Sequence, residues 1–397
     1  MTDTQSLLDY PLPRVDPLLP PPAYTELRNG PPRLVRLAGG RRAWLVSRYE
    51  DVRSAIADPR VSSDDMAPNF PALIPLPPTP RALSMFRLDN PDHASLRRMV
   101  IPEFTARATR ALQPDVERIT NELLDALVAG PKPADLMASF ADPLPTLVIA
   151  RLLGVPYEDH ELFQENGRIV TSPDATPEEA GQAFVVLTEF MGRLIETKRK
   201  DPQDDLISRL CVKYLEPGEI SFDDLLAMAR FLLFAGHDTT ANQIAMSVLY
   251  LLDNPDQLAL LRSDRSLIPS AVEELLRIAS IKQHDFIRTA SEDLEIAGVT
   301  IAKGEGIIFA LPSANHDETV FPDPGRLDIT RDAHHHMAFG HGIHKCVGAP
   351  LATLELETAI GALLDRFPDL QLSTEVKDIP YRDDMLLYGA HKLLVTW

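Results

Sequence analysis

The chain has 397 residues, of which 39 are Lys or Arg and 58 are Asp or Glu, giving a formal net charge of −19 at pH 7. A surface this acidic repels phosphates and anionic lipid headgroups, so we expect neither nucleic acid nor a membrane as partner. Apolar residues make up 45% and charged residues 24%, which is typical of a folded globular protein. With only two cysteines, Cys211 and Cys346, a disulfide scaffold and a four-cysteine zinc site are excluded.

The N-terminus lacks the basic and apolar regions of a signal peptide, and no run of about 18 apolar residues is present. We therefore expect a cytoplasmic protein. Residues 1–32 are rich in proline and are predicted to be an extended segment packed on the body. Residues 33–397 contain no flexible linker and are predicted to form one large domain.

The predicted elements follow in chain order. Alternating residues on both sides of Gly39-Gly40 indicate a hairpin over 33–47, and a short helix is expected at 50–57. A proline-rich loop over 58–91 comes next. Apolar residues then recur every three or four positions, which predicts helices over 92–130, 134–153, 157–170, 177–199, 222–253, 267–280 and 350–366. Strands are expected within 293–301, 304–312 and 391–397.

The segment from Phe339 to Pro350 carries the most chemical information. Its glycines permit tight turns and the close approach of a flat ligand. Cys346 precedes a helix predicted to begin near Pro350. A sulfur there meets free amide N–H groups and the positive end of the helix dipole, which stabilise the thiolate that a metal requires.

Two other interpretations of these residues are possible. An isolated cysteine is usually a buried core residue, and Cys211, on an apolar helical face, fits that description. A zinc site would need a recognised ligand spacing, which is absent here. The candidate ligands for it are His334, His335, His336, His341, His344 and Cys346. The triple histidine is expected at a surface turn.

The order Phe-Gly-x-Gly-x-His-x-Cys-x-Gly from Phe339 to Gly348 resembles the haem-binding loop of the cytochrome P-450 family of haem-thiolate monooxygenases. The resemblance implies a mainly α fold with a small β portion and a long central helix over haem. It implies that Cys346 is the axial ligand of haem b iron and that Phe339 packs beside the sulfur. Gly348 is then also a cofactor-binding residue.

Residues 235–240, Ala-Gly-His-Asp-Thr-Thr, lie halfway along the helix predicted for 222–253. Gly, Asp and Thr are poor helix formers, and such local conflicts often mark function. They are equally compatible with close helix packing at the glycine and a threonine bonded to the preceding turn. In the resemblance they correspond to the oxygen-binding kink. Thr239 is then the alcohol that holds water, Asp238 feeds protons inward, and Ala235 faces the haem.

Two further groups follow from the resemblance. Glu274 and Arg277 form a Glu-x-x-Arg pair that would join Arg326 in a structural triad behind the cysteine loop. The haem propionates need cations, since each carries a carboxylate. The candidates for that role are His93, Arg97, Arg288 and His344.

The implied reaction uses O2 and two electrons to insert one oxygen atom, by hydroxylation or epoxidation, into an organic substrate. A medium-sized, mainly apolar molecule of secondary metabolism is expected. Gln283-His284-Asp285 is a polar run where the family often has apolar residues, so a polar substrate group stays open. The expected substrate contacts are Met66, Leu73, Leu83, Ile169, Val170, Leu232, Leu233, Phe286, Ile287, Leu387 and Tyr388.

Electrons are expected from NAD(P)H through a separate ferredoxin and ferredoxin reductase, because the sequence carries no flavin or iron–sulfur motif. Ferredoxins are usually acidic, so a basic patch is needed on the cysteine side, and Arg98, Arg107 and Lys345 are candidates. Two alternatives stay open: a peroxygenase that uses hydrogen peroxide, and a non-enzymatic haem-binding sensor. The acid–alcohol pair Asp238-Thr239 argues against both.

Overall fold

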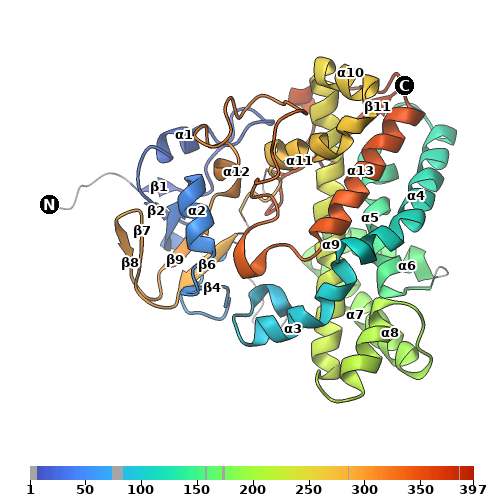
Figure 1. Cartoon of the computed structure of the whole chain (residues 1–397), viewed down its shortest axis with the longest axis horizontal. Helices are drawn as coiled ribbons and strands as arrows, with labels where there is room; N and C mark the ends of the chain where they lie inside the picture. The colour runs from blue at the N-terminus through green and yellow to red at the C-terminus, as the bar shows by residue number, and fades with distance from the viewer. Residues whose placement is uncertain (1–6, 74–83, 157–158, 172–174, 285, 384) are drawn as a thin grey trace.

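The computed structural model describes residues 7–73, 84–156, 159–171, 175–284, 286–383 and 385–397 (Figure 1). The predicted contact Leu83 and the polar residue Asp285 lie outside the described residues. The helices are α1 (Ala23–Leu27), α2 (Tyr49–Ile56), α3 (Asp92–Val100), α4 (Ala106–Ala129), α5 (Pro143–Leu153), α6 (His160–Thr171), α7 (Pro177–Lys200), α8 (Leu206–Leu210), α9 (Phe222–Asp253), α10 (Pro255–Ser263), α11 (Ile268–Ala279), α12 (Leu311–Ala314) and α13 (Ala349–Arg366). The strands are β1 (Leu8–Asp9), β2 (Arg33–Arg36), β3 (Arg42–Val46), β4 (Val61–Ser62), β5 (Ala134–Asp135), β6 (Ile287–Ala290), β7 (Leu294–Ile296), β8 (Val299–Ile301), β9 (Gly306–Phe309), β10 (Gln371–Leu372) and β11 (Leu394–Thr396).

The predicted fold class, mainly α with a small β portion, is confirmed. Helix α9 has 32 residues and the predicted bounds. It begins at Ser221, whose hydroxyl accepts a hydrogen bond from the Asp224 N–H at 3.0 Å. Because α9 is apolar nearly all round, it is buried among α5, α7, α11 and α13. Figure 1 shows α9 running the full length of the helical part.

The main β-sheet lies at the other end of the molecule from most of the helices, whereas β11 lies beside α13 (Figure 1). The main sheet has the strand order β1-β2-β3-β9-β6-β4. The predicted hairpin is confirmed as the antiparallel pair β2–β3, and both of its turn glycines, Gly39 and Gly40, have positive φ. Strand β6 pairs with the buried strand β9, which places Arg288 inside the molecule beside the helical part.

Predicted and observed bounds agree closely for α7, α9, α11 and α13, but the helix predicted over 92–130 is divided into α3 and α4 by a 3-10 turn at Ile101–Phe104. Several short elements were not predicted. α1 lies in the segment expected to be extended, and residues Met137–Ala141 form a π-helical turn within the predicted helix over 134–153. Short segments carry too few turns for periodicity to be read.

The N-terminal segment is attached to the body by polar and aromatic contacts. Tyr10 Oη lies 3.1 Å from His284 Nδ1, and Arg14 Nε donates to Gln283 Oε1 at 2.8 Å. The Arg14 guanidinium lies 3.8 Å from the centroid of the Tyr388 ring. Part of the unusual polar run, Gln283-His284, is thus occupied in holding the N-terminal segment. Among the described residues, none of the helices is long and apolar enough to span a membrane.

Candidate active site

The cysteine loop is a closed turn that leads into α13. The Cys346 N–H donates to the Phe339 carbonyl at 2.9 Å, which joins the two ends of the loop. Gly340 and Gly342 have φ values of 69° and 71°, so the predicted glycine turns are confirmed. A Cβ atom on Gly340 would lie 3.0 Å from the Phe286 ring. Phe286 therefore supports the loop, and only a residue without a side chain fits against it.

The Cys346 sulfur lies at the N-terminus of α13, as predicted. The N–H groups of Gly348 and Ala349 and the charges of Lys282 and Arg97 all lower the pKa of the thiol, yet burial outweighs them and the net pKa is raised. The predicted stabilisation of the thiolate by the helix N-terminus is therefore present, but burial has the larger effect on the pKa. A bound cation on the sulfur would supply the missing positive charge and release the proton.

The side chain of Cys346 is exposed. Protein atoms nevertheless surround it closely enough for burial to have the largest effect on its pKa. The two observations agree if the sulfur faces an open space inside the molecule rather than the outer surface. Ala235, in the middle of the otherwise buried helix α9, is also exposed. Such exposure halfway along a central helix places an open space beside it.

A cluster of cationic and imidazole groups lies near the cysteine loop. The rings of His93 and His344 lie 4.1 Å apart, and Arg97 donates to the Lys345 carbonyl at 2.5 Å. Burial, together with the charges of Arg97 and Arg288, lowers the pKa of His93 to about 4 and that of His344 to about 3. All four predicted propionate-binding residues are thus brought together.

The imidazoles of this cluster lack hydrogen-bond partners among the described residues. Both ring nitrogens of His93 and Nε2 of His344 are buried and have no hydrogen-bond partner among the described residues. Buried polar atoms without partners are costly, as are neighbouring cations without a carboxylate between them. A ligand that carries carboxylates would satisfy both needs, so the residues fit a haem with its two propionates.

Aromatic contacts connect this cluster to α9. Phe231, one turn before Ala235, stacks on Phe86 with ring centroids 6.1 Å apart. The Arg288 guanidinium lies 5.7 Å from the centroid of the Phe86 ring. The Ala235 face of α9 and the cationic cluster therefore border the same region. Sequence reasoning missed Phe231, although its i,i+4 spacing from Ala235 could have identified it.

Helix α9 is continuous through the segment predicted to contain the oxygen-binding kink. The Thr239 hydroxyl donates to the Ala235 carbonyl at 2.7 Å. A Cβ atom on Gly236 would lie 3.1 Å from Ile149 on α5. Both structural roles considered for this segment, close packing at the glycine and back-bonding by the threonine, are therefore present.

Asp238 forms an ion pair that sequence reasoning did not predict. Its carboxylate accepts hydrogen bonds from Arg382 at 2.8 and 3.2 Å and from the Asn242 side chain at 3.0 Å. The Asp238 side chain retains 17% exposure, against 5% for Arg382. Asp238 thus lies between the C-terminal segment and the interior of the molecule.

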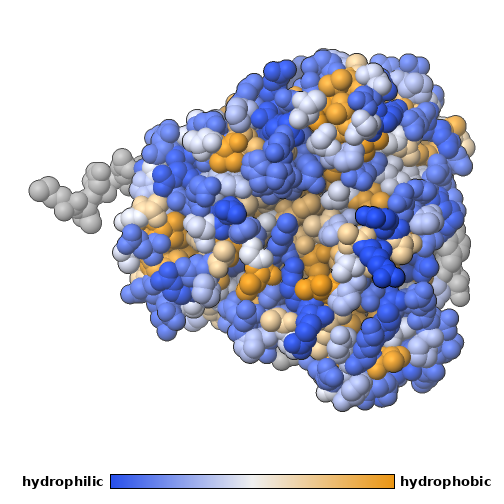
Figure 2. Space-filling model, viewed as in Figure 1, coloured by the Kyte–Doolittle hydropathy of each residue, from blue (hydrophilic) through white to orange (hydrophobic). Residues whose placement is uncertain are grey.

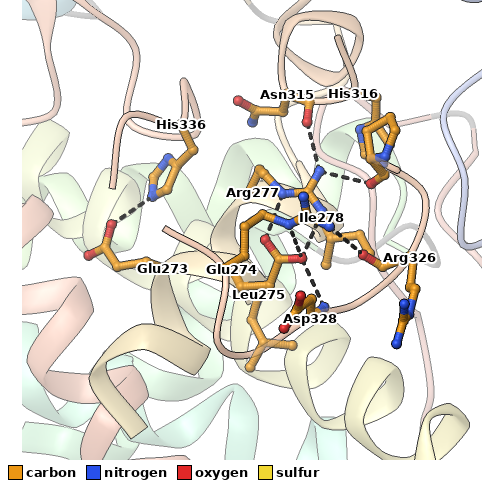
Figure 3. A network of polar contacts seen from close by, with 12 residues as sticks. Glu273, Glu274, Leu275, Arg277, Ile278, Asn315, His316, Arg326, Asp328 and His336 are labelled. Atoms are coloured by element: carbon orange, nitrogen blue, oxygen red, sulfur yellow. Dashed lines mark hydrogen bonds and ion pairs between the residues drawn. The ribbon is translucent and has the colours of Figure 1, made fainter. Parts of the chain in front are cut away.

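The Glu274–Arg277 pair is confirmed, but the predicted third member of the triad is wrong (Figure 3). Arg277 binds Glu274 through two hydrogen bonds of 2.7 and 2.8 Å, and both side chains are fully buried. Arg331, not Arg326, approaches Glu274, with its Nε 3.1 Å from Oε1. The guanidinium of Arg326 points away from Glu274 in Figure 3, and its residue is exposed. The turn before Arg331 directs this side chain inward, where Glu274 also accepts a hydrogen bond from the Asp328 N–H.

The triple histidine only partly lies at the surface. His334 is exposed and His335 half-buried, but His336 is buried, with Nε2 3.3 Å from Glu273 Oε2 (Figure 3). The ring of His336 also packs against Phe339, with centroids 5.6 Å apart. The expectation of a surface turn is therefore wrong for His336, because Glu273 and Phe339 supply it with interior partners.

The predicted substrate contacts are scattered. Leu232 and Leu233 are buried on α9, and Ile169 and Val170 are half-buried on α6. Met66 is 60% exposed, whereas Tyr388 is 1% exposed and stacks on Tyr381 under Arg14. Leu73 and Leu387 are half-buried, and Ile287 is buried within the β sheet. The α9 and α6 residues thus remain the best-placed candidates.

Comparison with known proteins gives a consistent result. The family model described as Cytochrome P450 matches residues 23–397. Cytochrome P450-SU2 of Streptomyces griseolus is 46% identical over 96% of this chain and 94% of that protein. Vitamin D3 dihydroxylase of the same species is 43% identical over 98% and 96%. The crystal structure of cytochrome P450 MoxA from Nonomuraea recticatena superposes with a TM-score of 0.93, at 40% identity and 98% coverage of both chains.

Proposed function

Because this chain belongs to the cytochrome P450 family and is a monooxygenase, we propose that Cys346 is the thiolate ligand of its haem b. The main support is the conjunction of two features. The sulfur lies at the amide N–H groups of Gly348 and Ala349, and unpartnered imidazoles lie beside arginines nearby. When bound, a haem with a thiolate ligand activates O2 for insertion of one oxygen atom.

The residues around the cofactor divide into two roles. His93, Arg97, Arg288 and His344 would bind the propionates, with the arginines supplying positive charge and the imidazoles donating hydrogen bonds through a ring N–H. Phe339 and Phe286 hold the cysteine loop in place, since one bonds Cys346 through its carbonyl and the other packs on Gly340.

Asp238 and Thr239 deliver protons to the site. The Thr239 hydroxyl donates to the Ala235 carbonyl, so its oxygen lone pairs are free to accept a hydrogen bond from water. Asp238 is bound to Arg382 and must exchange this partner for water before it can pass a proton inward. Release of Arg382 therefore controls proton entry.

Carbon monoxide binding to the reduced protein tests the assignment of the ligand. The wild type should show the strongly red-shifted Soret band that a thiolate ligand produces, and Cys346→Ala should lose it. Cys211→Ala is the matched control, because burial raises the pKa of that thiol to about 11 and it lies in the core. A red-shifted band that persists in Cys346→Ala would refute the proposal.

Turnover separates the monooxygenase from its alternatives. With NAD(P)H, ferredoxin, reductase and substrate, Thr239→Ala and Asp238→Asn should consume NAD(P)H but form less product per electron. A peroxygenase would turn over equally well with hydrogen peroxide alone and be insensitive to both substitutions. A sensor would form no product at all.

The substrate is a medium-sized, mainly apolar organic molecule of the kind made in secondary metabolism. One relative is named for vitamin D3, which is a medium-sized and mainly apolar molecule. Leu232, Leu233, Phe231 and Val170 are apolar and come from α9 and α6, so they offer hydrophobic contacts to it. A screen for compounds that displace water from the ferric haem, seen as a change of spin state, would identify ligands.

An acidic ferredoxin, itself reduced by a reductase that uses NAD(P)H, docks on the face that carries α3, α4 and α13. Figure 2 shows a paler, more apolar area near the centre of this face, ringed by hydrophilic residues. Arg98, Arg107 and Lys345 are all exposed, and Lys345 lines a pocket of about 470 Å³ together with Arg110. Both cysteines of the chain are free thiols, as is usual for a protein that acts in the reducing cytoplasm.

Charge reversal tests this docking surface. Arg98→Glu, Arg107→Glu and Lys345→Glu should each slow reduction by ferredoxin, most strongly at low salt, because charge steers association. Arg42→Glu, at an exposed position on β3 in the sheet, is the control and should leave the rate unchanged. Equal rates of reduction by ferredoxin in all four variants would show that ferredoxin does not dock on this face.

A further inference from the structure

Three potential metal ligands converge in the loop before the cysteine segment. Asp332, His334 and His335 each offer one ligand atom, and these atoms all lie within 4.8 Å of one another. Two of the residues are exposed and the third is half-buried. The mixture of two imidazoles and one carboxylate is a donor set that suits zinc and its neighbours in the periodic table.

His335 is held rigidly. Its ring stacks on Phe321 with centroids 4.7 Å apart and an interplanar angle of 9°, and the Tyr49 hydroxyl donates to its carbonyl at 2.7 Å. Within the described part of the chain, no residue hydrogen-bonds the ring nitrogens of His335. A fixed imidazole with an unused nitrogen loses little conformational entropy when it binds a metal.

His334 and Asp332 are already in contact, through a hydrogen bond between Nδ1 and Oδ1. Such a pair alone is an ordinary surface ion pair. Their side chains are 72% and 78% exposed, so both can move toward His335 without disturbing the core. Tetrahedral zinc with bonds of about 2.0–2.1 Å requires ligand atoms about 3.3 Å apart, so a shift of about 1.5 Å at most closes the site.

We propose that Asp332, His334 and His335 form a three-ligand surface site for a divalent transition-metal ion, with zinc as the representative ion and water in the fourth position. The site is distinct from the haem pocket. The zinc site considered from the sequence had six candidate ligands. The site proposed here keeps only His334 and His335 from that set and adds Asp332.

His334 also lines the pocket that contains Lys345, so the metal site adjoins the face proposed for ferredoxin docking. A bound dication would add positive charge beside that face. Zinc should therefore strengthen binding of an acidic ferredoxin, and this consequence, unlike metal binding itself, rests on the proposed function.

Titration of the untagged holoenzyme with zinc chloride, followed by calorimetry, tests the site. We expect one zinc ion per chain, and at least about tenfold weaker binding in each of Asp332→Asn, His334→Ala and His335→Gln. His391→Gln, at a histidine of the C-terminal segment, is the control and should bind like the wild type. Absence of saturable binding, or equal binding by all variants, would overturn the proposal.

The haem spectrum separates the two proposals. Binding of zinc to this site leaves the reduced carbon monoxide spectrum unchanged, whereas loss of that spectrum in the wild type would count against the proposed function only. Anomalous scattering from a zinc-soaked crystal gives an independent readout, because the peak must lie between Asp332 and His335. A peak elsewhere contradicts the assignment.

Discussion

Glu274 holds together three segments that are distant in the sequence. Its carboxylate binds Arg277 of α11, the Asp328 N–H and Arg331, while Arg277 also donates to the carbonyls of Asn315 and Pro324 at 2.8 and 2.9 Å. Each bond is inside the protein, where the loss of one partner leaves the others incompletely satisfied. The network therefore keeps α11 and the segments around Asn315 and Asp328 in register.

Substitution of Arg331 tests the corrected triad. Arg331→Gln should lower the free energy of unfolding by about 1–3 kcal/mol, because Glu274 loses a charged donor in a buried setting. Arg326→Gln removes an exposed arginine and should change it by less than about 0.5 kcal/mol. Urea denaturation of both variants measures the difference, and a larger loss for Arg326→Gln would restore the original assignment.

His316 makes stability depend on pH. It is 4% exposed, its Nδ1 donates to the Pro312 carbonyl at 3.0 Å, and its Nε2 has no partner among the described residues. Burial, followed by the charge of Arg277, lowers its pKa to about 3, from 6.5 when unfolded. Below pH 6.5 the unfolded chain therefore binds a proton that the folded chain refuses, and stability falls as the pH falls.

From pH 7 to pH 5 this histidine should cost the fold about 2 kcal/mol. His316→Gln should start less stable at pH 7, because the bond to Pro312 is lost, but should lose less stability on acidification. Chemical denaturation at several pH values gives the two slopes. Parallel slopes for wild type and variant would show that His316 does not titrate in this way.

At the scale of elements, α5 and α9 approach closely at Gly236. Ile149 is 3% exposed and cannot move easily, so a methyl group on residue 236 would compress it. Gly181 on α7 is exposed, and a methyl group added there would meet no atom within 4 Å. The same substitution should therefore have opposite effects at the two glycines.

Gly181→Ala should stabilise the protein by up to about 1 kcal/mol through helix propensity. Gly236→Ala should destabilise it, because compression of about 1–3 kcal/mol outweighs that gain. Ile149→Val in the Gly236→Ala background should recover part of the loss. Thermal denaturation of the holoenzymes measures all three, and a stabilised Gly236→Ala would show that α5 and α9 can separate freely.

At the scale of the molecule, the N-terminal segment joins regions that the chain order separates. Arg14 contacts Gln283, the Leu19 carbonyl and the ring of Tyr388 at once. These contacts connect the start of the chain to the loop after α11 and to the C-terminal segment. We propose that residues 7–32 and the body unfold as one unit.

Removal of this connection should be measurable. Arg14→Ala should lower the free energy of unfolding by about 1–2 kcal/mol, from the loss of two hydrogen bonds and one cation–π contact at a half-buried side chain. Arg36→Ala breaks the exposed pair with Asp9 and should cost almost nothing. A single transition is expected for both variants, and a separate early transition in either would show that the segment unfolds independently.

Features that depend on neighbouring residues were predictable. The capped, apolar α9, the glycine turns and helix start around Cys346, and the i,i+3 pair Glu274–Arg277 all follow from local geometry and propensity. The resemblance added the four propionate candidates, and the structure brings these together. For α9, the turns around Cys346 and the Glu274–Arg277 pair, the deciding interactions lie within a few residues or recur at helical spacing.

Choices among distant partners were not predictable. Asp238 could have paired with any exposed cation, and the fold selects Arg382, which lies 144 residues away. Arg331 rather than Arg326 reaches Glu274, His336 is buried while His334 is not, and burial outweighs the helix end at Cys346. Propensity and spacing act along the chain, whereas partner choice and desolvation depend on which side chains meet in three dimensions, and only the folded packing decides that.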